Sequence, residues 1–247
     1  MNYNEKVKIC VDRLKHSKKI FVITGAGISA ESGIPTFRGK NGYWKNQSPQ
    51  KLASPEGFAE DPKLVWEWYD YRRRLIKGCE PNPAHYSLSK LERKYDHFLI
   101  ATQNVDGLHQ RASSLNVVEI HGSIWEVKCT KDGRVEKNTE TPLKELPLKC
   151  SCGALMRPNI VWFGETLPEK QLKEIYDFIK TGDVDFTFII GTSALFYYII
   201  DWAQTVKNYG SFLVEINLDN TAISSIADIV FLNQAGIILP EITKQLI

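Results

Sequence analysis

The stretch KIFVITGAGISAESGIP, residues 19–35, runs from an apolar segment through a glycine-rich turn into a pattern typical of a helix start. Apart from its lysine, the segment before the turn is apolar or β-branched, which is typical of a strand buried on both faces. Gly25, Gly27 and Ala30 follow in the G-x-G-x-x-G/A spacing, in which glycines allow close backbone approach and helix-start amides hold a pyrophosphate. By itself this spacing is weak, because an ordinary strand-to-helix turn can show it.

Other apolar runs of the same kind recur along the chain and alternate with helical patterns such as residues 168–180. Each run is short, rich in β-branched or aromatic residues, and ends in small or polar residues. They are residues 97–104, 116–122, 185–193, 211–217 and 227–232. This alternation is typical of parallel strands joined by helices. The sequence therefore predicts an α/β fold with a doubly wound, parallel, Rossmann-like sheet.

Two stretches depart from the alternation and predict a smaller inserted module. Residues 39–83 are polar and turn-rich and then helical, whereas residues 127–156 hold three of the five cysteines and little apolar content. We expect the first to form a helical part and the second a zinc-ribbon-like part. The dinucleotide-binding domain is then expected to comprise residues 1–38, 84–126 and 157–247.

Composition and charge exclude several classes of protein. A formal net charge of +2 over 247 residues gives no strong field for nucleic acid, and the cysteine-bearing segment lacks the basic excess of a zinc-ribbon nucleic-acid binder. The longest uncharged run, residues 186–200, is shorter than the roughly 20 residues that span a bilayer. Because five cysteines occur without an export signal, we expect a cytoplasmic protein that binds neither nucleic acid nor membrane.

Further motifs follow the glycine-rich turn in a fixed order. They are ESGIPTFRG (31–39), TQNVDGLH (102–109), EIHGS (119–123), RPNIVWFGE (157–165), GTSA (191–194) and EIN (215–217). Taken together, they make the chain resemble the sirtuins, the NAD-dependent protein-lysine deacylases, from about residue 20 to the C-terminal strands. The resemblance implies that NAD and an acyl-lysine protein or peptide are converted to nicotinamide, O-acyl-ADP-ribose and free lysine.

Most of the motif residues would bind NAD by this resemblance. They are Gly25, Ala26, Gly27, Ala30, Phe37 and Arg38 in the loop, Gln103 at a ribose, Asn104 and Asp106 at the nicotinamide amide, and Gly191, Thr192, Ser193 and Asn217 at the phosphates and adenosine ribose. An amide and a carboxylate two residues apart on an extended segment point the same way, which suits one carboxamide. Ordinary hydrogen bonding at a strand end is the alternative. Since no acidic residue ends a second strand about twenty residues after the loop, Glu215 or Asn217 is the candidate for the usual ribose contact.

His121 is the candidate general base. It lies at the end of the expected strand in residues 116–122, just before Gly122, where a side chain can face a cleft. A lone histidine is more often structural, but the resemblance makes this residue catalytic together with Asn104. It implies that the histidine deprotonates a ribose hydroxyl of NAD, which then attacks the imidate formed from the acyl-lysine. An imidazole titrates near neutrality and suits that task.

Candidate substrate-binding residues lie in two segments of the chain. The first is an expected edge strand that pairs with the substrate peptide through main-chain bonds, formed by Val161, Trp162, Phe163, Gly164 and Glu165. The second is WEWYDYRRR, residues 66–74, in which Tyr69 and Arg72 lie three apart and share a helix face.

One sirtuin branch has a tyrosine and an arginine with this spacing in the acyl pocket. The resemblance therefore predicts that Tyr69 and Arg72 favour succinyl- or malonyl-lysine, whose acyl tip is a carboxylate. Arg73 and Arg74 fall off the shared face and are expected to matter little. The alternative is an ordinary helix with one apolar face and its arginines in water.

Three cysteines and an aspartate predict a metal site in the smaller module. Relatives have two cysteine pairs, but here Asp132 stands where the partner of Cys129 is expected, whereas Cys150 and Cys152 form a complete pair. Three thiolates and a carboxylate can bind zinc tetrahedrally, with the carboxylate as the weaker ligand. A module held by packing alone is the alternative.

A second departure lies at residues 191–200, where Tyr198 replaces a proline that is common in relatives. We expect the loop on the adenine side to have a different shape there. Two other functions stay open, a protein mono-ADP-ribosyltransferase and a non-catalytic NAD sensor, although His121 and Asn104 favour an enzyme. A monomer is expected.

Overall fold

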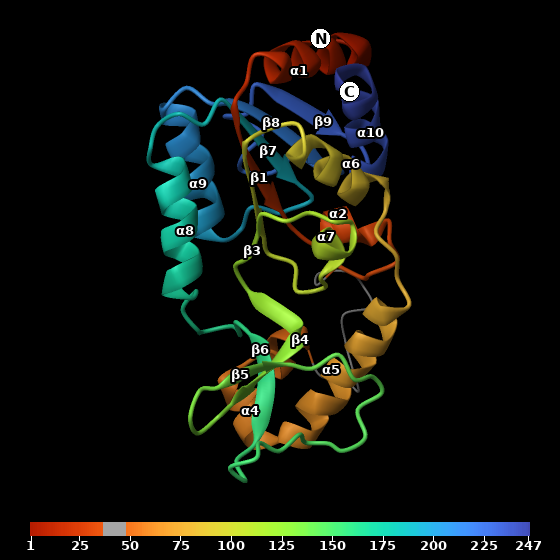
Figure 1. Ribbon diagram of the computed structural model, residues 1–247, viewed down its shortest axis with the longest axis vertical. Coiled ribbons are helices and arrows are strands. Elements are labelled where there is room, and N and C mark those ends of the chain that lie inside the picture. The colour runs from red at the N-terminus through yellow and green to blue at the C-terminus, as the bar shows by residue number, and fades with distance from the viewer. Residues whose placement is uncertain (37–47) are drawn as a thin grey trace.

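The computed structural model describes residues 1–36 and 48–247, and Figure 1 shows its elements. Phe37 and Arg38, two of the predicted loop residues, lie outside the described residues. The strands are β1 Lys19–Thr24, β2 His97–Thr102, β3 Val117–Glu119, β4 Gly122–Cys129, β5 Val135–Lys137, β6 Met156–Ile160, β7 Phe186–Ile190, β8 Phe212–Asn217 and β9 Ile229–Leu232. The helices are α1 Tyr3–Lys15, α2 Gly27–Ala30, α3 Pro49–Leu52, α4 Pro55–Glu60, α5 Pro62–Lys77, α6 Pro83–Glu92, α7 Leu108–Arg111, α8 Glu169–Ile179, α9 Tyr197–Asn208 and α10 Ala235–Leu246.

The larger sheet is parallel and, over the described residues, has the order β3-β2-β1-β7-β8-β9. β1 pairs with β2 on one side and with β7 on the other, so that Ile20 lies beside both Phe98 and Phe186. The strand order therefore reverses between β1 and β7, the place where doubly wound folds bind ligands beyond the carboxyl ends of their strands. Each apolar run expected to form a strand does so, and α8 lies within the helical pattern of residues 168–180. The predicted fold is confirmed.

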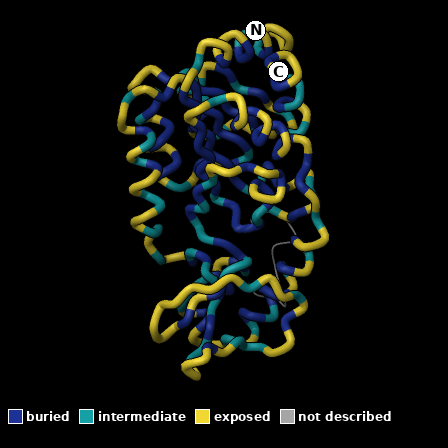
Figure 2. The backbone as a smooth tube through the Cα atoms, in the orientation of Figure 1, coloured by how far each residue is buried: buried dark blue, intermediate teal, exposed yellow. Residues whose placement is uncertain are grey.

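Alternate residues of these strands face two different cores, which explains why the strands are apolar throughout. In β1, Ile20 and Val22 pack with residues of α1, α6 and α10, whereas Phe21 and Ile23 pack with residues of α8 and α9. All four side chains are fully buried, and each such burial contributes about 1.5–3 kcal/mol. Figure 2 shows the buried chain concentrated in this sheet. A rigid sheet thus supports the loops at its carboxyl edge.

The smaller module consists of α3, α4, α5 and an antiparallel sheet whose order, in the part of the chain that the structure describes, is β5-β4-β6. It lies at the end of the long axis opposite the two termini (Figure 1). Its core joins α5 to β4 and β6, and the Trp66 indole donates to the Met156 carbonyl at 2.8 Å. The smaller sheet begins at residue 122 and ends at residue 160, so it extends a few residues beyond the predicted 127–156 segment on both sides.

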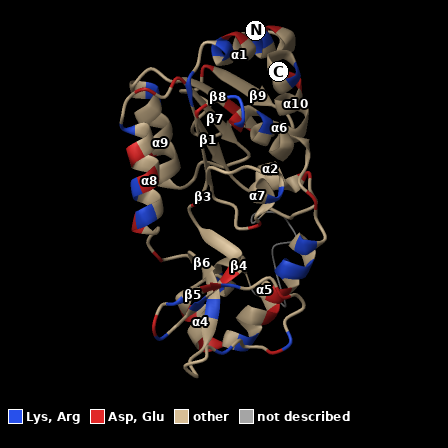
Figure 3. Ribbon diagram, viewed as in Figure 1, with Lys and Arg blue, Asp and Glu red and all other residues tan. Residues whose placement is uncertain are grey.

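Charges of both signs are interspersed along α8, whereas in α5 a mostly basic block, residues 72–77, follows Glu67 and Asp70 (Figure 3). Among the described helices, none combines the length and apolar character needed to cross a membrane.

Candidate active site

A cavity of about 950 Å³ lies beyond the carboxyl ends of β1, β2, β7 and β8 and extends to the smaller module. Every predicted cofactor- or substrate-binding residue that the structure describes lines this cavity. These residues are Gly25, Ala26, Gly27, Ala30, Tyr69, Arg72, Gln103, Asn104, Asp106, His121, Val161, Trp162, Phe163, Gly164, Glu165, Gly191, Thr192, Ser193 and Asn217. Segments far apart in the sequence therefore meet at one site.

The loop after β1 packs directly against the loop after β7, which explains its glycines. A Cβ on Gly25 would lie 2.8 Å from the Gly191 carbonyl oxygen, and a Cβ on Gly27 would lie 2.6 Å from the Gly191 Cα. The Gly27 amide donates to that carbonyl at 2.8 Å, and the Gly25 amide donates to the Ile190 carbonyl at 3.0 Å. These two amides hold the loops together, and contact of this loop with the pyrophosphate stays a prediction. The following helix, α2, has only four residues.

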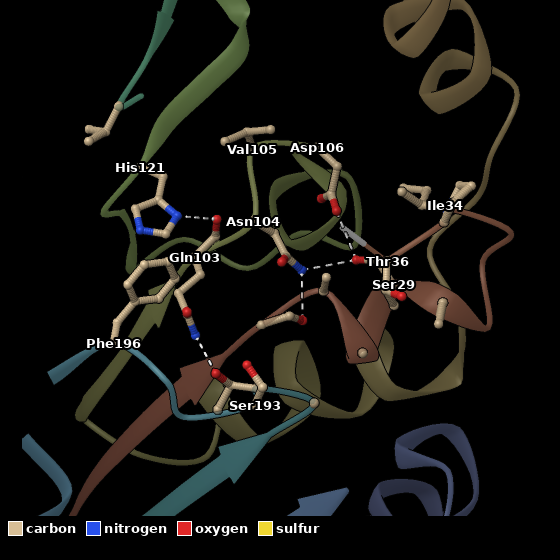
Figure 4. A pocket seen from close by; sticks show the side chains of 18 of the residues that line it. Ser29, Ile34, Thr36, Gln103, Asn104, Val105, Asp106, His121, Ser193 and Phe196 are labelled. Atoms are coloured by element: carbon tan, nitrogen blue, oxygen red, sulfur yellow. Dashed lines mark hydrogen bonds between the residues drawn. The ribbon is translucent and has the colours of Figure 1, made fainter. Parts of the chain in front are cut away.

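Asn104 and Asp106 converge on Ser29, as Figure 4 shows. The Asn104 amide donates to Ser29 Oγ and to the Gly25 carbonyl, both at 3.1 Å, while Ser29 Oγ donates to Asp106 Oδ2 at 2.8 Å. Burial raises the pKa of Asp106, against the hydrogen bonds from the Leu108 amide and the Ser29 hydroxyl. An amide and a carboxyl group thus border the cavity together, as their spacing predicted.

Side chains tie the carboxyl ends of β2, β7 and β8 together. Gln103 Nε2 donates to Thr192 Oγ1 at 2.8 Å, and Asn217 Nδ2 donates to the Thr192 carbonyl at 2.7 Å. Glu215 is buried and accepts hydrogen bonds from two hydroxyl groups that follow β8. Of the two candidate ribose contacts, it is therefore Asn217 that lines the cavity.

His121 connects β3 to β4 and has a partner at each ring nitrogen. Nδ1 lies 2.9 Å from the Gln103 carbonyl oxygen, which can only accept, so Nδ1 carries the proton. The unprotonated Nε2 accepts a hydrogen bond from the Tyr198 hydroxyl at 2.7 Å. Burial lowers the pKa of His121 to about 4, an effect that the bond to Gln103 opposes. The imidazole is therefore neutral at pH 7, the state that a general base requires.

Tyr69 and Arg72, both on α5, border the cavity from the smaller module. The Trp162 indole donates to the Tyr69 hydroxyl at 2.8 Å, which leaves the tyrosine proton available for donation. Burial raises the pKa of Tyr69 to about 12, so the hydroxyl stays neutral. Burial also lowers the pKa of Arg72, against the attraction of Tyr69 and Asp106, but a guanidinium remains charged at neutral pH. A hydroxyl donor and a cation thus lie side by side.

Residues 161–165 do not form the expected edge strand. β6 ends at Ile160, and a turn follows. The Glu165 carboxylate accepts a hydrogen bond from the Trp162 amide at 2.8 Å and pairs with Arg157 at 2.6 Å. The visible role of Glu165 is therefore to support the turn, and main-chain pairing of this segment with a substrate peptide stays a prediction.

The arginines of α5 lie in different environments. Arg74 is exposed and pairs with Asp70 at 3.2 Å. Arg73, by contrast, is 0 % exposed, donates to Asn138 Oδ1 at 2.6 Å and lies 5.5 Å from the Trp125 ring centroid. Arg73 therefore joins α5 to the segment after β5 instead of facing water, as the alternative of an ordinary helix would have it. That it matters little for acyl recognition stays a prediction.

Cys129, Asp132, Cys150 and Cys152 form one cluster at the end of β4. One ligand atom from each lies within 4.8 Å of the others, and the sulfurs of Cys129 and Cys152 are 3.6 Å apart. Tetrahedral zinc with bonds of about 2.3 Å places two thiolate sulfurs about 3.8 Å apart. A backbone hydrogen bond from Cys152 lowers the pKa of Cys150 to about 7 against the effect of burial, which favours the thiolate that metal binding needs. The donor set fits zinc.

Sequence reasoning missed two hydroxyl groups of the site. Ser29 lies in the glycine-rich stretch without an assigned role, yet it joins Asn104 to Asp106. A hydroxyl in the first turn after the glycines, where side chains face neighbouring strand ends, was an available signal. Tyr198 was expected only to reshape a loop, yet it reaches His121 from 77 residues away, and no local pattern indicates that contact.

Comparisons with known proteins agree with this geometry. A family model described as "Sir2 family" matches residues 25–197, which contain the glycine-rich loop, His121 and the cysteine cluster. A protein of Aquifex aeolicus (strain VF5) named "NAD-dependent protein deacylase" is 47% identical over 218 residues, which are 88% of this chain and 90% of that protein.

Solved structures show the same fold. One described as a "Sir2 homolog-NAD complex" is 39% identical, with a TM-score of 0.91 over 97% of this chain and 93% of that chain. Another, described as "Sir2-p53 peptide-NAD+", is 30% identical, with a TM-score of 0.85 over 97% and 98% of the two chains. By its matched motifs, its sequence identity and its fold, the chain belongs to the Sir2 family.

Proposed function

We propose that this chain removes acyl groups from protein lysines with NAD as the co-substrate. The observation that carries the proposal is the arrangement of polar groups in one cavity, with neutral His121 on one side and the Asn104–Ser29–Asp106 cluster on the other (Figure 4). The relatives support it: one is named a deacylase, one solved structure contains NAD, and another contains a peptide with NAD+.

The residues of the cavity suit the chemistry that NAD supplies, namely a glycosidic bond to a cationic leaving group and ribose hydroxyl groups. Breaking that bond requires an oriented leaving group and an acyl oxygen on the opposite face of the sugar. In this proposal Asn104 and Asp106 hold the carboxamide of the leaving group. Gln103 and Asn217 hold sugar hydroxyls, and His121 receives the hydroxyl proton.

We further propose that the preferred acyl group ends in a carboxylate, as succinyl and malonyl groups do. Tyr69 offers a hydroxyl proton because its oxygen already accepts from Trp162, and Arg72 borders the same part of the cavity. Hydrogen bonds between charged partners are roughly twice as strong as neutral ones. An acetyl group lacks the terminal carboxylate, so it offers this pair no charged acceptor.

The cysteine cluster is proposed to hold one structural zinc ion through Cys129, Cys150, Cys152 and Asp132. It lies at the end of β4 opposite His121. Zinc would therefore stabilise the smaller module without taking part in acyl transfer.

A panel of peptides that share one sequence tests the proposal. Each peptide carries acetyl-, succinyl-, malonyl- or glutaryl-lysine, and mass spectrometry follows the free lysine, nicotinamide and O-acyl-ADP-ribose formed with NAD. We expect His121→Ala to fold and bind NAD but to lose turnover by at least about 100-fold, the low end for a general base.

Other outcomes would identify other functions. ADP-ribose added to an acceptor protein without deacylation would indicate a mono-ADP-ribosyltransferase. NAD binding without nicotinamide release for any peptide would indicate a sensor. Near-normal turnover of folded His121→Ala would contradict its role as the base.

A further inference from the structure

The lone pair of the proposed base already accepts a hydrogen bond. Because Nδ1 of His121 donates to the Gln103 carbonyl, the lone pair is on Nε2, where the Tyr198 hydroxyl donates to it at 2.7 Å. Both residues line the cavity. A sugar hydroxyl that approaches His121 must therefore either displace Tyr198 or bind to its oxygen.

Packing holds Tyr198 in place. Its ring stacks on Phe196, with centroids 5.5 Å and planes 9° apart, and packs against Trp202 at 5.2 Å. Tyr198 is 6 % exposed and belongs to the core formed with α8 and α9. An aromatic ring buries roughly 150–250 Å², so withdrawing it into solvent is costly. This packing opposes displacement of the Tyr198 hydroxyl from His121.

We propose that Tyr198 is a catalytic residue that relays the proton of the sugar hydroxyl to His121, an inference that rests on the proposed deacylase function. The sugar hydroxyl proton moves to Tyr198 Oη as the Tyr198 proton moves to His121 Nε2. The electron pair of the broken O–H bond stays on the sugar oxygen, which becomes the nucleophile. His121 then holds the proton as an imidazolium whose Nδ1 remains bonded to Gln103.

The two transfers are concerted in this mechanism. Burial raises the pKa of Tyr198, with a further contribution from Tyr197, so a free tyrosinate is unfavourable. A tyrosine that gains one proton while it loses another stays neutral throughout. The tyrosine oxygen can accept from the sugar because its own proton is directed at Nε2.

Tyr198→Phe tests the relay because it keeps the ring and removes the hydroxyl. Nicotinamide exchange, measured with NAD and acyl-peptide, should stay within about twofold of wild type, since cleavage of the glycosidic bond does not need the base. Single-turnover formation of free lysine should fall by about 100-fold or more. In the NAD-free protein, the pKa of His121 measured by NMR should rise, because the lost hydrogen bond favoured the neutral ring.

Tyr176→Phe is the matched control. It also removes a hydroxyl from a ring that packs against Trp202, but that hydroxyl bonds to Asp201 at 2.9 Å outside the cavity. Both rates should equal those of wild type.

Unchanged lysine release by folded Tyr198→Phe would overturn the relay and make the contact structural, and faster release would show that the tyrosine blocks the base. If this variant does not fold, the wild-type single-turnover rate in mixtures of light and heavy water decides. Two protons in flight give a curved dependence on the deuterium fraction, whereas a linear dependence overturns the relay. No nicotinamide exchange by wild type with any acyl-peptide would instead overturn the deacylase function itself.

Discussion

Arg72→Met is the substitution that separates recognition of the acyl tip from structural support. Arg72 borders the cavity beside Tyr69, and burial lowers its pKa without removing its charge at neutral pH. One hydrogen bond to a charged group contributes about 1.5–3 kcal/mol. At about 1.4 kcal/mol per tenfold change, its loss should lower kcat/KM for a succinyl-peptide by roughly 10- to 150-fold. The acetyl-peptide rate should stay nearly unchanged, because acetyl-lysine has no carboxylate to bind.

The assay compares kcat/KM for succinyl- and acetyl-peptides of one sequence. Arg74→Met is the matched control, because it removes an exposed arginine from the same helix whose ion pair with Asp70 is 3.2 Å long. This control should leave the ratio of the two activities unchanged. If Arg72→Met lowers both activities equally, Arg72 supports the fold of α5, and the proposed acyl preference is refuted.

Four further outcomes are expected. Elemental analysis should find one zinc ion per chain, and Cys152→Ser should remove it. Asp132→Ala should only speed the loss of zinc to a chelator, since carboxylate is the weaker ligand. If Asp132→Ala retains zinc as long as wild type does, Asp132 is not a ligand. The acid limb of kcat/KM, which reports the free enzyme, should lie well below pH 6.5, because burial lowers the pKa of His121 to about 4. Burial also lowers the pKa of His85 and His109, so as the pH falls the unfolded chain binds these protons before the folded chain does. The stability that the two histidines contribute is complete above pH 6.5 and is lost as the pH falls toward 4. The raised pKa of Glu119 acts in the opposite direction, and urea unfolding of wild type at pH 5.5 and 7.5 measures the balance. Gly122→Ala should lower the free energy of unfolding by about 1–3 kcal/mol more than Gly164→Ala does. The angle φ is positive at both positions, but only a Cβ at 122 would meet a described backbone atom, the Asn159 oxygen at 2.0 Å. Equal urea midpoints of the two variants would mean that this contact relaxes freely.

The sequence was sufficient for the large sheet because burial on both faces leaves little choice of residue. All six residues of β1 are buried, so its apolar run could be found without any partner. The site could be predicted to the same extent because parallel strands end at one edge. The motifs after β1, β2, β7 and β8 therefore had to meet.

The sequence could not show contacts between elements that are far apart in the chain, because no periodic pattern links them. The helical spacing placed Arg73 off the shared face, but only the fold brings Asn138 and Trp125 over it. Likewise, the segment after β6 has the composition of a strand. In the structure it contains a turn, and Glu165 pairs there with Arg157, eight residues away.

The proposed base and the proposed acyl pocket depend on two neighbouring contacts at the end of β6. The Val161 amide donates to the His121 carbonyl at 2.9 Å, just where β4 begins and β6 ends, and the next residue, Trp162, donates to Tyr69. β4 and β6 pair from Gly122 and Ile160 at one end to Cys129 and Met156 at the other, with a register shift between Ser123 and Val127. We expect a shift at the cysteine cluster to reach both contacts through these paired strands. Loss of zinc should therefore lower turnover and acyl selectivity in parallel, although no metal ligand borders the described cavity.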